Sequence, residues 1–454
     1  MVDITRAPDM ENQPLTPSEM HGKKHLKVTE INYRNNADSN YTEKIKELDK
    51  NFSYSSHSND YWSEPELSTL YGTPLYEAAS PSQKLALNHF YWAGQYIQTA
   101  ATEANAVVYN QLTAGVFSTL YGYGTLCQEL DLETDQERHH IHAFHTISYK
   151  TKLALLGKTG LKNPLYGKKL DKPRFTFKLP SLQALTFQDS TLRFVANTML
   201  KNQADCYSPY LKKLDREGKS IPAPGGSVFE PSGSQGLQKF FTLNWGSSPF
   251  LACQYYVQRF MANMLLKNYE YSYTRYFKEL NAKGKSIPAP TAVSYYHFLD
   301  ESFHTTTSQL IARDMYKDFS KPTAYEKFIA NVGFYMSQRD VVSGISGGIP
   351  AIFRDDAAFF LVYYRILRSP VFDMSVPEAL HWMQRCLCEE HEGFHMNIKH
   401  HQRLLTPLCN FCDSLDFLWP VNREMSIMAS GVAIDKAIQR NIKAFNEFSR
   451  SVTA

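Results

Sequence analysis

The spacing of apolar and polar residues predicts a chain built almost entirely of helices. Residues 80–83, Ser-Pro-Ser-Gln, form a helix-capping pattern, and a long helix is expected to run from there past Glu103. The same pattern at Thr134 predicts a second helix that ends near Gly157. Strand signals are few, so the predicted fold class is all-α. Further helices are expected at residues 322–337, 354–368, 376–405 and 421–450.

Two other stretches of the pattern set limits on the architecture. Residues 1–60 are rich in Asn, Ser, Lys and Glu with little apolar periodicity, which predicts a flexible N-terminal arm. The longest apolar run, residues 357–364, is far shorter than the roughly 20 residues that span a bilayer and predicts a buried core helix. The N-terminus has no apolar run typical of a secretory signal, so we expect a cytoplasmic protein.

An internal repeat shapes the predicted domain organisation. Residues 193–224 and 259–290 resemble one another, and both end in Gly-Lys-Ser-Ile-Pro-Ala-Pro. Two copies are too few for a solenoid, so we interpret them as a duplicated helix-turn unit, in which Ala204 corresponds to Glu270. The expected organisation is an arm over residues 1–60 and a single helical domain over residues 61–454, with a bundle at about 80–317 and a C-terminal helical extension at about 318–454.

Charge and cysteine content exclude several classes of protein. The 454 residues carry a net charge of +3, so no global field attracts nucleic acid or a membrane surface. The loop from Lys158 to Arg174 is locally basic, which predicts either a dock for an acidic partner or a solvated connector. Seven cysteines over so long a chain favour a reducing compartment without a disulfide framework.

Carboxylates and histidines follow the order that a two-metal site in a helical bundle requires. Such a site takes single Glu residues from two helices and a Glu-x-x-His motif from each of two others, because positions i and i+3 share a helix face. His297 lies four residues before the second motif and adds a third imidazole. The predicted metal ligands are Glu103, Glu137, His140, Glu270, His297, Glu301 and His304. No catalytic residue is assigned beyond these.

A third Glu-x-x-His competes with this set. Glu392 and His395 lie close to Glu389, His391, His400 and His401, so they could replace one of the other motifs or bind a different metal. They lack matching single Glu helices in the required order. For the seven-residue set, oxygen donors with three imidazoles favour two iron ions, with manganese or a mixed pair as the alternative.

With these residues in order, the sequence resembles the ferritin-like dimetal oxygenases related to p-aminobenzoate N-oxygenase (the AurF-like group) over roughly residues 80–310. The motif from His297 to His304, His-Phe-Leu-Asp-Glu-Ser-Phe-His, is the most specific part. The interval between Glu137 and Glu270 is longer than in those enzymes, and removing the 66-residue offset of the repeat leaves a compact bundle spacing. Residues 62–72 and 80–89 look most like the cyanobacterial branch, the CylC-type dimetal fatty-acyl halogenases.

The resemblance implies a ferritin-like bundle that activates O2 with iron and chlorinates an unactivated C–H bond. Its substrate would be a fatty acyl chain on an acyl carrier protein in a natural-product pathway, with chloride as co-substrate and an external electron donor. An AurF-like N-oxygenase or hydroxylase on the same site, and a non-catalytic ferritin-like metal-binding protein, stay open as alternatives. Nucleic-acid and membrane partners are not expected. Chain length, carbon attacked, halide and oligomeric state, including a homodimer, also stay open.

Overall fold

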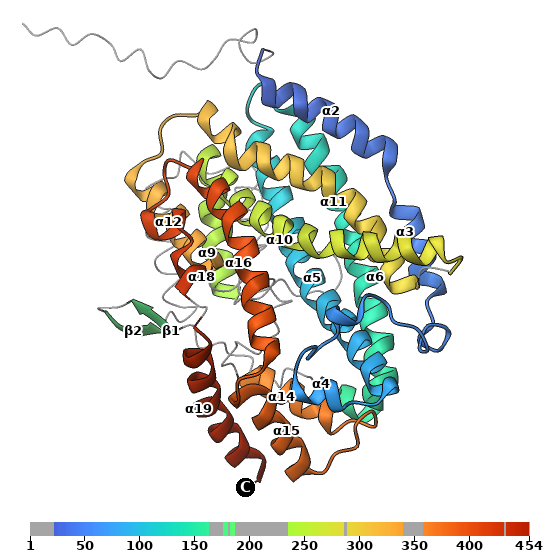
Figure 1. The fold of residues 1–454 in the computed structure, drawn as a ribbon. Coiled ribbons are helices and arrows are strands. Elements are labelled where there is room, and N and C mark those ends of the chain that lie inside the picture. Colours follow the sequence, from blue (N-terminus) through green and yellow to red (C-terminus); the bar gives the residue numbers. More distant parts are fainter. Residues whose placement is uncertain are drawn as a thin grey trace, which may run out of the picture.

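Four long helices form the centre of the molecule. The computed structural model describes residues 22–162, 176–179, 182–186, 235–285, 288–338, 357–430 and 433–453. Helix α5 packs along α6, α10 packs along α11, and the two pairs contact each other through α5 with α10 and α6 with α11 (Figure 1). This arrangement confirms the predicted all-α, ferritin-like helical bundle. The four helices span Pro81–Phe117 (α5), Gly124–Lys162 (α6), Pro249–Ala282 (α10) and Ala289–Arg313 (α11).

The sequence signals at the ends of α5 and α6 have different outcomes. The Ser80 hydroxyl accepts from the Gln83 backbone N–H, and the Gln83 side chain accepts from the Ser80 N–H, which confirms the predicted cap. Thr134 instead lies inside α6, where its hydroxyl donates to the Leu130 carbonyl, so the predicted start there is wrong. Burial of the upstream turns against neighbouring helices extends α6 back to Gly124. Gly157, with φ of 71°, interrupts α6 near the predicted end.

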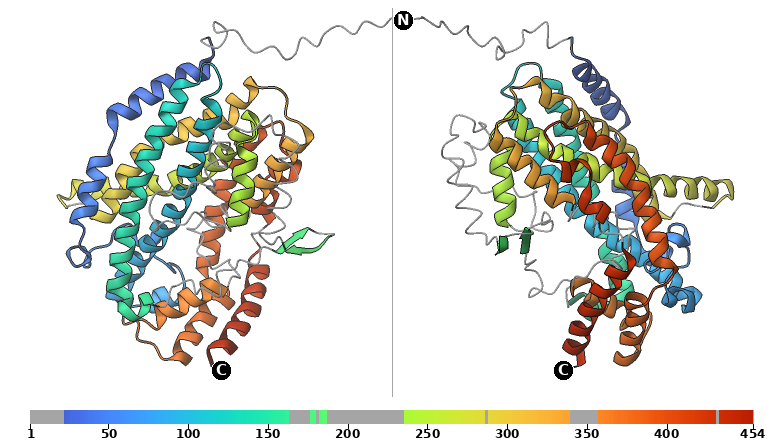
Figure 2. Two further views of the ribbon diagram at one scale, coloured as in Figure 1. Left: turned by 180° about the vertical axis from the view of Figure 1, so that it is seen from behind. Right: turned by 60° about the vertical axis from the view of Figure 1, so that its left-hand side comes forward.

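Two N-terminal helices correct the prediction of a flexible arm. Helices α2, Lys24–Ser39, and α3, Thr42–Asn51, lie along α6 and α11 on the outside of the bundle (Figure 2). The buried residues of α2 are polar: Asn32 and Asn36 are buried and bond to side chains of the bundle. Polar residues that pack inward leave no apolar periodicity, which is why the pattern resembled an arm. Residues 1–21 lie outside the described part of the chain.

The C-terminal helices pack against the start of the bundle. Helices α14, α15 and α19 share an apolar core with the short helix α4, Pro74–Ala78, and with the first turns of α5. The predicted run 376–405 is two helices separated at residues 389–391, and 421–450 is three segments. Their bounds are Ala324–Ser337 (α12), Ala357–Leu367 (α14), Val376–Cys388 (α15), Glu392–Asp413 (α16), Pro420–Arg423 (α17), Ser426–Ser430 (α18) and Ile434–Thr453 (α19).

Smaller elements complete the described residues. Helix α9, Gln235–Trp245, packs on α10, and short 3-10 turns lie at Tyr54–Ser56, Pro65–Leu67 and Met315–Asp318. Strands β1, Thr176–Leu179, and β2, Leu182–Thr186, pair antiparallel with Thr176 opposite Thr186. This hairpin was not predicted and is a small exception to the all-α fold.

The internal repeat is only partly described. Its second copy forms the later half of α10 and the turn that follows, where Gly284 takes a φ of 66° that favours glycine. The first copy, residues 193–224 with Ala204, lies outside the described residues, as does the basic loop from residue 163 onward. Across the described ranges, every helix is too short or too polar to traverse a lipid bilayer.

Candidate metal centre

Three helices bring six of the seven predicted ligands together in the interior of the bundle. Helix α5 contributes one Glu, α6 contributes one Glu-x-x-His motif, and α11 contributes a stripe with a spacing of four and three residues. One helix face presents each set because such positions lie above one another. All six side chains are buried: Glu103, Glu137, His140, His297, Glu301 and His304.

The first group of donors joins all three helices. Glu103, His140, His297 and Glu301 each offer an atom within 4.8 Å of the others. His297 Nε2 lies 2.8 Å from Glu103 Oε1 and 3.5 Å from Glu301 Oε1. Two carboxylates and two imidazoles therefore converge on one point.

The second group lies beside the first and shares a residue with it. Glu137, Glu301 and His304 also offer atoms within 4.8 Å of one another. His304 Nδ1 lies 2.7 Å from Glu301 Oε1 and 3.3 Å from Glu137 Oε1. Glu301 thus belongs to both groups, as a carboxylate between two neighbouring metal ions would.

Glu270 is the one predicted ligand whose side chain lies outside the described part. Its backbone belongs to α10, which packs against both α5 and α11. The helix is therefore in the right layer of the bundle, and the role of Glu270 stays a prediction.

Burial and mutual charge strongly perturb the acids of this cluster. Burial, followed by the neighbouring Glu137 carboxylate, raises the pKa of Glu103 to about 7 against the opposing effect of His297. Burial also acts to raise the pKa of Glu301, but His304 and His297 outweigh it and hold that pKa well below the usual value. The protonated imidazoles thus act as counter-ions to the carboxylates. Metal ions that bound here would take over this role and displace the protons from the imidazoles.

The donor set fits a pair of metal ions. Glu103 Oε2 is buried and has no hydrogen-bond partner among the described residues. A buried carboxylate oxygen is costly unless a hydrogen bond or a cation satisfies it. Oxygen donors combined with imidazoles are typical of iron and manganese sites.

Two residues that precede the motif glutamates hold the motif histidines from behind. Asp300, next to Glu301, places Oδ2 3.1 Å from His140 Nε2. Gln136, next to Glu137, places Oε1 2.9 Å from His304 Nε2. Both contacts fix the orientation of the imidazole rings, so that each Nδ1 atom points toward the carboxylates.

A buried arginine borders the cluster. Arg259 on α10 donates to Glu133 Oε2 at 2.5 Å, to Glu137 Oε1 at 2.6 Å and to Asn110 Oδ1 at 3.0 Å. Sequence reasoning missed Glu133 and Arg259. Glu133 lies one turn before Glu137 on the same buried face of α6, and that spacing was the available signal. No local pattern marks Arg259 as its partner.

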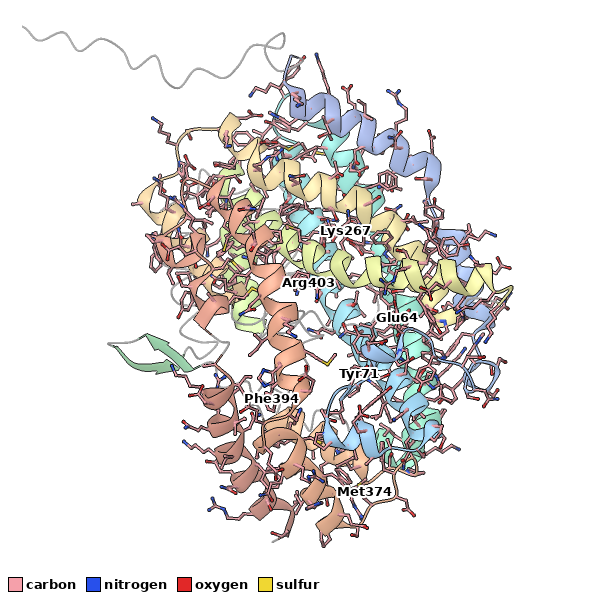
Figure 3. The ribbon with its side chains drawn as sticks, in the orientation of Figure 1. Glu64, Tyr71, Lys267, Met374, Phe394 and Arg403 are labelled. Atoms are coloured by element: carbon pink, nitrogen blue, oxygen red, sulfur yellow. The ribbon has the colours of Figure 1, made fainter. Side chains whose placement is uncertain are left out.

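The competing motif at Glu392 lies apart from the donor groups. Glu392 opens α16, and His395 Nε2 contacts the exposed Glu390 at 2.9 Å instead of a buried acid. Gly393 N–H donates to the Gly72 carbonyl, so this helix start is fixed against the loop before α4. Phe394 belongs to an apolar cluster against which Tyr71 packs; both residues are labelled in Figure 3. Within the described ranges, neither group of metal-binding donors includes Glu392 or His395.

A comparison with known protein families identifies the family of the chain. A family model described as acyl halogenase CylC-like matches residues 24–449, which is nearly the whole chain. No curated protein and no solved structure matches. The chain therefore belongs to the CylC-like acyl halogenase family.

Proposed function

We propose that the protein is a dimetal halogenase, with iron as the expected metal, that replaces an unactivated C–H bond of an acyl chain by C–Cl. The observation that carries the proposal is Glu301, which belongs to two buried donor groups inside the bundle of an acyl halogenase family member. O2 is the proposed oxidant, chloride the halogen source and an acyl carrier protein the carrier of the chain.

Two iron ions in these groups would supply the electrons that reduce O2 and the oxidising power that removes hydrogen from an aliphatic carbon. The balanced change converts the C–H bond, chloride, O2, three protons and two electrons from an external donor into the C–Cl bond and two water molecules. The chain excludes bulk water by burying every described donor side chain. Asp300 and Gln136 orient the motif histidines, and Arg259 fixes one oxygen of Glu137.

Two further parts of the proposal concern the partner and the compartment. The basic segment Lys158–Arg174 would dock the acidic carrier protein, and only its beginning, at the end of α6, is described. A reducing compartment, the cytoplasm, is supported by the six cysteines of the described chain, all of which are free.

The test is product analysis after anaerobic loading with Fe(II). The loaded protein is mixed with acyl carrier protein bearing a fatty acyl chain, a reductant, chloride and O2. We expect a product with one hydrogen replaced and the isotope pattern of chlorine. Glu301→Ala should abolish this product, while Glu392→Ala, in the exposed third motif, should retain it. A product that gains only oxygen would contradict halogenation and favour a hydroxylase.

A further inference from the structure

We propose that the two metal positions are inequivalent, and that the position beside His140 binds its metal more tightly than the position beside His304. The inference rests on the proposed function, because it concerns the same pair of ions. It is carried by the groups behind the two histidines and not by the ligands alone.

The supports of the two histidines have the same geometry but different charge. In each case the residue before the motif glutamate reaches across to the histidine of the other helix. Behind His140 this residue is Asp300, a carboxylate. Behind His304 it is Gln136, a neutral amide.

The amide of Gln136 is fixed in one orientation. Gln136 Nε2 donates to Asn36 Oδ1 at 2.8 Å and lies 3.5 Å from Asp300 Oδ1. Both acceptors hold the NH2 group on that side, so the carbonyl oxygen faces His304 and accepts from its Nε2–H. Helix α2, which supplies Asn36, therefore takes part in setting up the metal centre.

A carboxylate acceptor makes an imidazole a stronger metal donor than an amide acceptor does. Outer partners of metal-bound histidines typically change metal affinity by about 10- to 100-fold. His140 has the stronger support, and its donor group also contains His297 as a second imidazole. The described side chains of the other group contain one imidazole.

Arg259 acts in the same direction. Its guanidinium donates to Glu137 Oε1, the oxygen that lies 3.3 Å from His304 Nδ1. The positive charge withdraws electron density from this carboxylate and repels a second cation. All three differences therefore weaken metal binding at the position beside His304, so the two positions should fill in order and accept different ions.

The test is a titration of the metal-free protein with Mn(II) without O2, in which free Mn(II) is measured by electron paramagnetic resonance. The wild type should bind in two separate steps. Gln136→Glu should strengthen the weaker step by about 10- to 100-fold, and Asp300→Asn should weaken the tighter step by a similar factor. Gln338→Glu is the matched control, because this buried glutamine bonds to Asn422 and not to a candidate ligand; its titration should equal that of the wild type.

The strengthening expected for Gln136→Glu separates electronic from structural effects, since damage to the fold would weaken binding. The inference is overturned if the wild type binds two ions in one step, or if Gln136→Glu fails to strengthen the weaker step and Asp300→Asn leaves the tighter one unchanged. A wild type that binds no metal would refute the proposed function itself, which is a different result.

Discussion

Replacement of Arg259 by Met should strongly destabilise the metal-free protein. The Arg259 side chain is 4% exposed, and its carboxylate partners are 0% (Glu133) and 1% (Glu137) exposed. The variant loses two charge-assisted hydrogen bonds of about 1.5–3 kcal/mol each. It also leaves two buried carboxylates without their cation, and breaking a buried pair in this way costs about 3–5 kcal/mol. We expect the free energy of unfolding to fall by about 3–5 kcal/mol.

The assay is denaturant-induced unfolding followed by circular dichroism, with and without metal. Bound metal compensates Glu137, so the loss caused by Arg259→Met should be smaller in the loaded protein. Adding Glu133→Gln should recover part of the loss. The matched control is Arg313→Met, since Arg313 is 38% exposed and pairs with Asp314, and such a pair is worth at most about 1 kcal/mol. Equal losses for Arg259→Met and Arg313→Met would refute the reasoning.

Two further predictions concern residues of α5 that hold the loop before it. Burial lowers the pKa of His89 to about 4, against the opposing effect of the Asp60 carbonyl, to which its Nε2–H donates. Its Nδ1 accepts from the Tyr54 hydroxyl. Below pH 6.5 the unfolded chain therefore binds a proton at His89 that the folded chain does not bind, so up to about 3 kcal/mol of stability should be lost as pH falls from 6.5 to 4. Unfolding followed by fluorescence at each pH checks this. A stability that does not change with pH in the wild type, or an equal loss in acid for His89→Leu, would contradict it. Asn88→Ala removes a buried amide whose oxygen accepts from the Trp62 N–H. It should cost about 1–3 kcal/mol, measured by the same unfolding assay, and a neutral variant would refute this role.

The sequence predicted the parts of the site that depend on helix periodicity. Glu137 with His140, and Glu301 with His304, are spaced three residues apart, so a single helix face was enough to bring each pair into contact. Their convergence with Glu103 followed from the order of motifs along the chain. The start of α5 was equally predictable, because the cap at Ser80 is local.

What the sequence could not provide depends on contacts between distant segments. Asn36 supports Gln136 from a helix whose composition resembled a disordered arm. Arg259 reaches Glu133 across 126 positions of the sequence, and no local pattern encodes such a pair. Thr134 carried a capping pattern that lies inside a longer helix, where tertiary burial outweighed it.

The central claim, that one buried cluster holds two metal ions, is tested most directly by metal analysis. The protein would be loaded with Fe(II) without O2, desalted and analysed by plasma mass spectrometry. We predict two iron ions per chain in the wild type and in Glu392→Ala, and fewer than one in Glu301→Ala, because Glu301 serves both donor groups. A wild type without bound metal, or a Glu301→Ala variant that keeps two ions, would contradict the account.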